Sequence, residues 1–396
     1  MIAAFLLPFP FRGYRAPYLW VYYRLMTAFD EPMRFIASHD YLTDPDLWAA
    51  QGRWELQAHS QSRLGYRIPT SAEMQRHRYG LLPGALFETL LAEAGGNPVA
   101  AFRRLLTERM PALEGAIETA LADTRDLEAV LTWCNCPSLS AVAARRGVPV
   151  LHLEAGPLRW PHYRATGYLD FQGVNGHTEA AVRHQQAKPR FGPEVTRNRL
   201  RAFFYTGVPP VQTRTHALGL PLQVEDDSNL VAFGHDHDNQ ALLIRALLAQ
   251  PDRDVLVRAH PGSVFALKPD WYRLDDSPDS ITFIGRCRRI LTINSSVGLE
   301  ALLWNTPVEA LGDSSYRHLV DADDPVGALA FYLFAYLVPM DLIYQPDYLR
   351  FRLARPSEPA IVARHLDAYG VAHAGPQADL PVLVAQALAG IDAGAV

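Results

Sequence analysis

The segment Leu291-Thr-Ile-Asn-Ser-Ser-Val-Gly-Leu-Glu-Ala-Leu-Leu303 decides the fold of this chain. An apolar run with β character stops at Asn294, Ser295 and Ser296, and an apolar run with helical character starts directly after them. The first N–H groups of a helix lack partners within the helix and carry the positive end of its dipole, so this strand-to-helix junction predicts an anion site. Plain N-capping by the polar side chains is the alternative, and both can hold at once.

A second predicted strand end precedes the junction, at Arg258-Ala-His-Pro261. Residues 255–257 are apolar and Pro261 stops the strand, so the imidazole of His260 is expected at the carboxyl edge of the sheet, where ligands of open α/β sheets gather. A single histidine at a strand end is more often structural. The equivalent edge position of residues 294–296 favours a binding role for this one.

The composition is that of an ordered globular protein. The chain has 396 residues, of which 49% are hydrophobic and 20% charged, enough for two domains with separate cores. A net charge of −5 argues against nucleic acid as a partner, because binders of the phosphate backbone carry a basic face. A small anionic substrate would instead need a local basic pocket.

The cysteines and the N-terminus bear on location and metals. Cys134, Cys136 and Cys287 are too few for a disulfide framework, and the C-x-C pair lacks the second pair of a zinc site, so we expect buried apolar roles and no metal. Residues 1–10 are apolar without a preceding basic residue or a clear cleavage site, which predicts a first strand and a cytoplasmic protein. The apolar run 326–340 is shorter than the ~20 residues of a spanning helix and predicts a buried helix, with membrane-surface contact as the alternative.

The order of elements predicts an α/β fold with two Rossmann-type domains that face each other across a cleft. A β-α-β unit is expected from a strand at 127–133, a helix at 138–146 and a strand at 148–153. Residues 98–122 are expected to be mainly helical, with Asn97 as the cap and Pro98 as the first helical residue. Residues 40–80 show no clean period.

The second half repeats this alternation, and a Gly- and Pro-containing linker at 206–215 separates the halves. The predicted domains are 1–210, 211–340 and a helical 341–396 that packs back on the first. Strands are expected at 229–233, 254–259, 281–284, 289–293 and 306–311, and helices at 238–250, 296–304, 358–369 and 380–391.

Acidic residues stand at two places where a reaction could use them. In Glu154-Ala-Gly-Pro-Leu-Arg159, Glu154 follows a predicted strand, as a general acid/base would, although an ion pair with Arg159 that closes a turn is the alternative. In Pro221-Leu-Gln-Val-Glu-Asp-Asp-Ser-Asn229, three carboxylates suit a solvated loop, a Mg²⁺ site or a nucleophile for a sugar anomeric carbon.

The segment Gly234-His-Asp-His-Asp238 contains a His-x-His pair that can ligate zinc. It follows one predicted element and precedes a helical run. We interpret it as a loop in which Asp238 caps the next helix.

Four of these segments, in this order and spacing, resemble the retaining β-Kdo glycosyltransferases of bacterial capsule and O-antigen assembly, the KpsC and WbbB class. The resemblance covers about residues 150–316. It rests on Glu154-Ala-Gly-Pro-Leu-Arg159, Pro221-Leu-Gln-Val-Glu-Asp-Asp-Ser228, Arg258-Ala-His-Pro261 and Asn294-Ser-Ser-Val-Gly-Leu-Glu-Ala-Leu302, followed by Pro307-Val and Leu311-Gly312.

The resemblance implies a GT-B-like fold, CMP-β-Kdo as donor, no metal or other cofactor, and retention of the β configuration. Residue by residue, it makes Asp227 the candidate nucleophile that forms a Kdo adduct and Glu154 the candidate acid/base. His260 with Ser295 and Ser296 would bind the CMP phosphate.

The remaining roles in the predicted site belong to His260, Asn294 and Arg159. His260 would also help CMP to depart, and Asn294 belongs to the phosphate-binding junction. Arg159 could meet the Kdo carboxylate, an expectation that comes from its charge alone.

The expected partners are CMP-β-Kdo or CMP and an oligosaccharide or lipid-linked glycan acceptor, with a polysaccharide assembly complex at the inner membrane as a further candidate. Two alternatives stay open: a transferase for another CMP-sugar such as a sialic acid, and a non-catalytic glycan-binding component of such a complex. The joint presence of Glu154, Asp227 and His260 favours catalysis, because a binding module does not need two acids beside a phosphate site.

Overall fold

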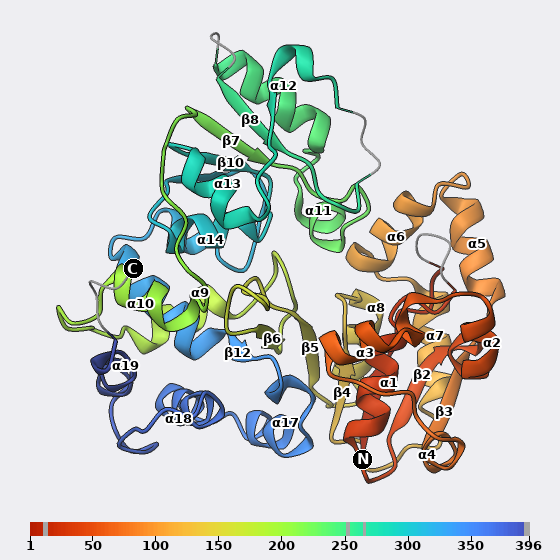
Figure 1. Ribbon diagram of the computed structural model, residues 1–396. Helices are drawn as coiled ribbons and strands as arrows, with labels where there is room; N and C mark the ends of the chain where they lie inside the picture. The colour runs from red at the N-terminus through yellow and green to blue at the C-terminus, as the bar shows by residue number, and fades with distance from the viewer. Residues whose placement is uncertain (11–14, 251–253, 264–266, 392–396) are drawn as a thin grey trace. The chain divides into compact units, whose positions relative to one another are not determined.

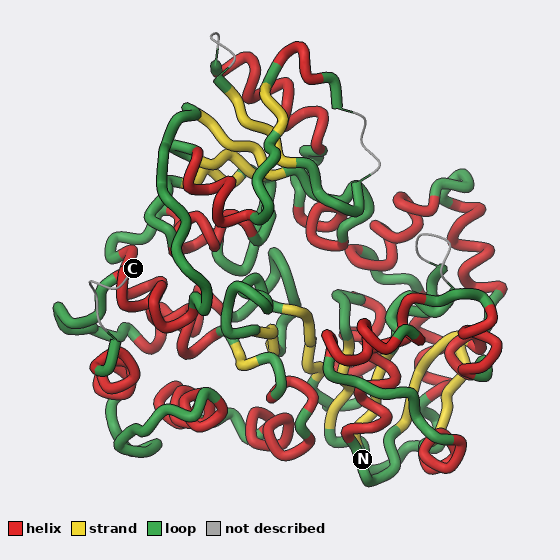
Figure 2. Tube along the Cα trace, in the orientation of Figure 1, coloured by secondary structure: helices red, strands yellow, loops and turns green. Residues whose placement is uncertain are grey.

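The computed structural model describes residues 1–10, 15–250, 254–263 and 267–391, and it divides into two compact units. Unit 1 comprises residues 1–154, 170–172 and 341–355, and unit 2 comprises residues 155–169, 173–340 and 356–396. Each unit contains parallel strands and helices (Figure 2). The predicted α/β class is therefore confirmed. The domain ranges 1–210, 211–340 and 341–396, and the cleft between the domains, stay predictions.

The sheet of unit 1 has the strand order β5-β4-β1-β2-β3, and each strand is parallel to its neighbours in this order (Figure 1). Every residue of the two inner strands β1 and β4 is buried, as expected of a parallel sheet covered on both faces. The predicted strands at the N-terminus, 127–133 and 148–153 are confirmed. The bounds are β1 (Ile2–Phe5), β2 (Arg34–Ser38), β3 (Arg78–Leu82), β4 (Ala129–Thr132) and β5 (Val150–Ala155).

The helices of unit 1 begin at recognisable caps. The side chain of Asn97 accepts hydrogen bonds from the N–H groups of Val99 at 3.0 Å and Ala100 at 3.1 Å, and Pro98 is the first residue of α6, as predicted. Residues 40–80 form short helices before β3. The helices are α1 (Leu19–Ala28), α2 (Pro45–Ala50), α3 (Ala58–Leu64), α4 (Ser71–Arg76), α5 (Ala85–Glu93), α6 (Pro98–Thr107), α7 (Pro111–Ala120), α8 (Pro137–Arg145) and α17 (Pro346–Leu353), with 3-10 turns η1 (His39–Leu42), η2 (Trp54–Leu56) and η5 (Leu342–Tyr344).

The sheet of unit 2 is parallel in the order β11-β10-β7-β8-β9 (Figure 1). Its middle strand β7 was not predicted, because Gly219 and Pro221 interrupt a short run. Glycine is needed there, since a Cβ at Gly219 would lie 2.5 Å from the Cys287 sulfur. The strands are β7 (Leu218–Pro221), β8 (Val255–Arg258), β9 (Arg273–Leu274), β10 (Ile290–Thr292) and β11 (Val308–Ala310).

Two predicted strands of this unit are wrong: residues 229–233 and 281–284 lie in helices α11 (Ser228–Phe233) and α13 (Ser280–Arg286). A carboxylate caps each helix. Asp227 accepts from the N–H of Asn229 at 2.8 Å, and Asp279 accepts from that of Thr282 at 2.7 Å. A short apolar run has no period that separates strand from helix, so the cap decided.

The other predicted elements of the second half are confirmed as the strands β8, β10 and β11 and the helices α12, α14, α18 and α19. Helix α12 packs along β7, and α14 packs along β10 (Figure 1). The helices of unit 2 are α9 (Ala180–Ala187), α10 (Arg197–Phe204), α11, α12 (Asn239–Ala249), α13, α14 (Val297–Leu303), α15 (Arg317–Val320), α16 (Pro325–Phe331), α18 (Glu358–Ala368) and α19 (Leu380–Ala389), with a 3-10 turn η3 (Pro269–Trp271).

The apolar run 326–340 is buried, as predicted, but it is not one helix. Helix α16 passes into a π-helical segment, η4 (Tyr332–Tyr336), and the chain then becomes the short strand β12 (Val338–Pro339), which pairs antiparallel with β6 (Thr166–Asp170). Pro339 disfavours helical backbone at the residue before it, which accounts for the change. In the part of the chain that the structure describes, no helix has both the length and the apolar character to cross a bilayer.

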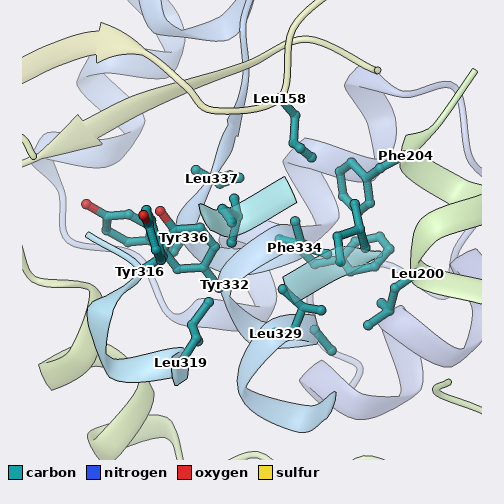
Figure 3. Packing of buried hydrophobic residues seen from close by; sticks show 14 of the residues in the cluster. Leu158, Leu200, Phe204, Tyr316, Leu319, Leu329, Tyr332, Phe334, Tyr336 and Leu337 are labelled. Atoms are coloured by element: carbon teal, nitrogen blue, oxygen red, sulfur yellow. The ribbon is translucent and has the colours of Figure 1, made fainter. Parts of the chain in front are cut away.

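This segment forms the centre of the main core of unit 2 (Figure 3). The ring of Phe334 lies 4.9 Å from that of Phe203 and 5.2 Å from that of Phe204, centroid to centroid. Helices α18 and α19 add Val362 and Leu383 to the same cluster. The core therefore joins segments that are far apart in sequence.

Candidate functional site

A cavity of about 240 Å³ lies in unit 2, where β7 and β8 end and α14 begins. It brings together four of the predicted ligand-binding residues. These are Arg159, His260, Ser295 and Ser296. Parallel strands present their carboxyl ends at one edge of the sheet, which is why two junctions separated in sequence meet here.

The two serines at the start of α14 have different surroundings. The Ser295 hydroxyl accepts a hydrogen bond from the N–H of Val297 at 3.3 Å, so part of its role is local capping. Ser296 stands at the N-cap position with helical backbone and makes no capping hydrogen bond through its side chain. The capping interpretation therefore applies to Ser295, and the Ser296 hydroxyl is available at the cavity wall.

Asn294 is only 1% exposed and is not among the residues that line the cavity. Its side-chain oxygen accepts from the amide of Gln223 at 2.9 Å, and its side-chain nitrogen donates to the carbonyl of Asn229 at 3.0 Å. The amide of Asn229 in turn donates to the Asn294 carbonyl at 2.9 Å. These hydrogen bonds hold the start of α14 against the segment 221–229, so the structure makes Asn294 a positioning residue. Its contact with a ligand stays a prediction.

Asp227 is half-buried at the N-cap of α11. Its Oδ1 accepts from the N–H groups of Asn229 at 2.8 Å and Leu230 at 3.4 Å. Of the neighbouring acids, Glu225 accepts a hydrogen bond from the Ser263 hydroxyl. Asp227 is not among the residues that line the 240 Å³ cavity. The structure therefore distinguishes the helix cap Asp227 from Glu225, which binds Ser263. The role of Asp227 as a nucleophile stays a prediction.

Glu154 lies at the end of β5 and belongs to unit 1, whereas every residue that lines the cavity belongs to unit 2. Within unit 1 the charge of Glu154 acts on two buried groups, the Tyr344 hydroxyl and the Cys134 thiol. Burial is the main cause that raises the pKa of both groups, and the negative charge of Glu154 raises it further. The Arg159 guanidinium donates to the carbonyl of Gly156 at 3.0 Å, which closes the turn after β5.

Glu300 is a cavity residue to which the sequence analysis assigned no role. It lies on α14, is 6% exposed, and accepts a hydrogen bond from the Ser280 hydroxyl at 2.8 Å. Burial raises the pKa of Glu300 to about 7, against the smaller opposing effects of hydrogen bonds from Ser280 and Tyr163. A lone acid in the apolar run Val-Gly-Leu-Glu-Ala-Leu-Leu was the signal that could have revealed it.

Arg258 adds a second guanidinium to the cavity wall. Its Nη1 donates to Asp275 at 2.5 Å, and Asp275 also pairs with Arg286 at 3.0 Å although its side chain is fully buried. This buried carboxylate fixes Arg258 in place. With Arg159 and His260, the cavity therefore carries the local basic character that an anionic ligand requires.

The His-x-His segment forms a loop before α12. The side chain of Asp238 accepts from the N–H of Ala241 at 2.7 Å, which confirms it as the helix cap, and His235 pairs with Asp313 at 2.9 Å. Across residues 1–10, 15–250, 254–263 and 267–391, no group of three His, Cys, Asp or Glu side chains is arranged to hold a metal. The three cysteines are buried and unpaired, as predicted.

Known proteins resemble both parts of the chain. Residues 4–179 match the Glycosyltransferase 99 family N-terminal domain, and residues 211–319 match the Capsule polysaccharide biosynthesis protein family. Protein FixF of Sinorhizobium fredii is 35% identical over 117 residues, which cover 27% of this chain and only 29% of FixF.

Two solved structures of Thermosulfurimonas dismutans KpsC are similar. The β-Kdo 2,7 transferase has a TM-score of 0.45 at 16% identity, covering 61% of this chain and 89% of that one. The β-Kdo 2,4 transferase has a TM-score of 0.38 at 18% identity, covering 48% and 71%. The two family matches cover the segments that carry the resemblance found in the sequence, and together they support a glycosyltransferase related to those of capsule polysaccharide biosynthesis.

Proposed function

We propose that the protein is a retaining glycosyltransferase that moves β-Kdo from CMP-β-Kdo to a bacterial surface-polysaccharide acceptor. The observation that carries the proposal is the basic, hydroxyl-lined cavity at the ends of β7 and β8. Guanidinium, imidazole and hydroxyl donors suit a nucleotide phosphate better than a neutral ligand. The family matches supply the reaction class.

In the proposed first step, the bond between the anomeric carbon and the phosphate oxygen breaks, and CMP leaves with the electron pair. His260, Ser295 and Ser296 would meet the charge that develops on the phosphate. The Asp227 carboxylate forms a bond to the anomeric carbon on the opposite face, giving a covalent Kdo adduct with inverted configuration. Arg159 would bind the carboxylate of the sugar.

In the second step, an acceptor hydroxyl attacks the anomeric carbon, its proton passes to Glu154, and the bond to Asp227 breaks. Two inversions give overall retention. The acceptor in this proposal is an oligosaccharide or lipid-linked glycan of O-antigen or capsule assembly. Work at the cytoplasmic side of the inner membrane, within an assembly complex, is part of the same proposal.

One substitution at Asp227 separates its chemical role from its role as a helix cap. Asparagine caps helices as well as aspartate does, so Asp227→Asn should keep the fold and the affinity for CMP while losing transfer and the adduct. The measurements are transfer from CMP-β-Kdo, intact mass of the protein, and CMP affinity by calorimetry. Asp226→Asn is the matched control and should retain transfer.

Full transfer by Asp227→Asn would refute Asp227 as the nucleophile. A wild-type protein that binds CMP but transfers no Kdo to any acceptor, and forms no adduct, would support a non-catalytic glycan-binding component. Another CMP-sugar with a carboxylate, such as a CMP-sialic acid, would meet Arg159 equally well. Adduct formation with each donor in turn distinguishes the two sugars.

His260→Ala tests the phosphate site. Loss of a charge-assisted hydrogen bond to phosphate corresponds to about 1.5–3 kcal/mol, so CMP affinity should fall roughly 10- to 100-fold. His237→Ala, in the loop before α12, is a histidine control outside the cavity lining. Equal CMP affinity of the His260 variant and the wild type would contradict the placement.

A further inference from the structure

A basic surface of unit 2 has no part in the proposed reaction. The chain carries a net charge of −5, yet residues 197–215 contain four arginines and residues 286–289 contain three, and neither segment contains Asp or Glu. Arg214 precedes β7 and Arg288 precedes β10, so both lie at the amino ends of parallel strands. The cavity lies at the carboxyl ends of such strands, and neither arginine lines it.

Three of these arginines meet around Asn305, the second residue after α14. Nη1 of Arg197 donates to the side-chain oxygen of Asn305 at 2.8 Å, and Nη2 of Arg214 donates to its carbonyl at 3.2 Å. Nε of Arg288 donates to the carbonyl of Arg214 at 3.2 Å. Among the residues that the structure describes, no carboxylate forms an ion pair with any of the three.

Acids elsewhere in unit 2 pair with other groups. Asp254 pairs with His216 at 3.0 Å, and Asp276 pairs with Arg286 at 2.5 Å. The carboxyl end of α14 attracts cations, but a helix end carries only about half a negative charge. It therefore accounts for one nearby guanidinium and leaves the group with a net positive charge. Like charges held together repel one another, so their placement favours an anionic partner.

Two valines project from the same surface. Val208 is 89% exposed and Val211 is 82% exposed, the largest exposed fractions among the large apolar side chains in the described ranges. The two residues between them are Pro209 and Pro210, which have no N–H group. The segment therefore presents apolar side chains and has fewer polar groups to desolvate than an ordinary loop.

Printed contacts connect the valines with the arginines. The Tyr205 hydroxyl donates to the carbonyl of Val208 at 3.0 Å, and its ring lies 5.1 Å from that of Trp304, the residue before Asn305. Val211 stands three residues before Arg214, whose N–H donates to the carbonyl of Gly285 at 2.9 Å. A Cβ at Gly285 would lie 3.5 Å from the carbonyl oxygen of Val211. The basic and apolar groups thus form one continuous surface.

We infer that this surface binds the anionic headgroups of a lipid bilayer. We call it the Asn305 patch, and its members are Arg197, Arg214, Arg288, Asn305, Val208 and Val211. Guanidinium groups bind lipid phosphates, and valines can enter the boundary between headgroups and acyl chains. A nucleic acid would meet the same charges but would leave both valines in water.

The inference rests on the proposed function only in taking the bilayer as the place where a lipid-linked acceptor is met. Binding to a bilayer itself requires neither CMP nor transfer. The surface also lies away from the cavity, so its variants should leave the donor site unchanged.

The test is co-sedimentation of the full chain with vesicles. One set contains phosphatidylglycerol in phosphatidylethanolamine, and the other contains phosphatidylcholine alone. Arg214→Gln with Arg288→Gln removes two charges from the patch. Arg245→Gln with Arg317→Gln removes the same charge from side chains that are 53% and 40% exposed outside the patch, and it is the matched control.

We expect the wild type to bind the anionic vesicles and not those of phosphatidylcholine, with weaker binding at higher salt. Each basic side chain near an anionic surface contributes about fivefold, so the patch variant should bind roughly 25-fold more weakly. The control variant should bind within about twofold of the wild type.

A second pair of substitutions tests the apolar part of the patch. Val208→Ser with Val211→Ser should weaken vesicle binding by about tenfold without changing the charge. Val182→Ser, at an exposed site on α9, is its control and should bind as the wild type does. CMP affinity by calorimetry should be the same in all variants. If one variant does not fold, the other still tests the patch.

The inference is overturned if the wild type does not bind anionic vesicles, or if the patch variants bind as tightly as the wild type. Release by inorganic phosphate, but not by sodium chloride of equal ionic strength, would indicate a site for free phosphate and would also overturn it. Tighter binding to a duplex DNA fragment than to vesicles would have the same consequence.

Failure of the proposed function would have a different signature. A wild type that binds vesicles but neither binds CMP nor transfers Kdo would count against the proposed function and leave the Asn305 patch intact. The two failures are therefore distinguishable.

Discussion

Replacing Glu300 by glutamine is expected to change how the stability of unit 2 depends on pH. Burial raises the pKa of Glu300 from 4.5 to about 7. The folded protein therefore holds this proton over a range in which the unfolded chain has released it, so stability is lost as the pH rises from about 4.5 to about 7 and is level above that range. Glutamine keeps the shape and can still accept from Ser280, but it does not titrate.

The size of the effect follows from the pKa. Each tenfold change in proton affinity corresponds to about 1.4 kcal/mol, so a rise from 4.5 to about 7 corresponds to an order of 3 kcal/mol. Between pH 4.5 and pH 8, the free energy of unfolding of the wild type should thus fall by about 3 kcal/mol relative to that of Glu300→Gln. Other titrating groups contribute equally to both proteins and cancel in the comparison.

Urea unfolding followed by circular dichroism at a series of pH values measures this difference. Val182→Ala is the control, because this exposed residue on α9 carries no titrating group. Its pH profile should run parallel to that of the wild type. If Glu300→Gln also runs parallel to the wild type, the reasoning from burial is refuted.

The remaining predictions concern packing and a buried charge, and each is measured by urea unfolding. Phe334→Ala removes a fully buried ring and should lower the free energy of unfolding by about 3–5 kcal/mol. Val182→Ala, at an exposed site, should change it by less than about 0.5 kcal/mol. Similar values for the two variants would contradict the packing shown in Figure 3. Gly219→Ala should lower the free energy of unfolding by about 1–3 kcal/mol, because the added methyl group overpacks the core. Gly115→Ala, in a helix with open space around it, should raise the free energy of unfolding by about 0.5–1 kcal/mol. Stabilisation by both variants would contradict the close packing at Gly219. Asp275→Ala should cost about 1.5–3 kcal/mol, because Arg258 and Arg286 lose a fully buried carboxylate while Arg286 keeps its pair with Asp276. The variant should also weaken CMP binding, and an unchanged CMP affinity would show that Asp275 does not position the cavity wall.

Strand ends in the sequence predicted which candidate residues lie close together. They predicted that His260 and the 294–296 junction stand at one sheet edge, and the structure brings His260, Ser295 and Ser296 to one cavity. This worked because the carboxyl ends of parallel strands meet at one edge, whatever the rest of the fold does. The capping role of Asp238 was equally local and could be predicted from its position before a helix.

Element type failed where the segments were short. Residues 229–233 and 281–284 are apolar runs too brief to show a period, and only the capping carboxylates of Asp227 and Asp279 mark them as helices. Strand β7 was missed because Gly219 interrupts its short apolar run, and a glycine is required there by the close approach of Cys287. The approach of Cys287 to Gly219 joins segments distant in sequence, so it could not be predicted from the residues around Gly219.

The order of residues along the chain determined which chemical groups follow each strand, and so the kind of site that could form. Tertiary structure decided which of those groups face the cavity. Gln223 and Asn229 form hydrogen bonds with the side-chain amide of Asn294, and burial raises the pKa of Glu300 to about 7. These effects depend on tertiary structure, because the hydrogen-bond partners and the desolvation come from segments distant in sequence.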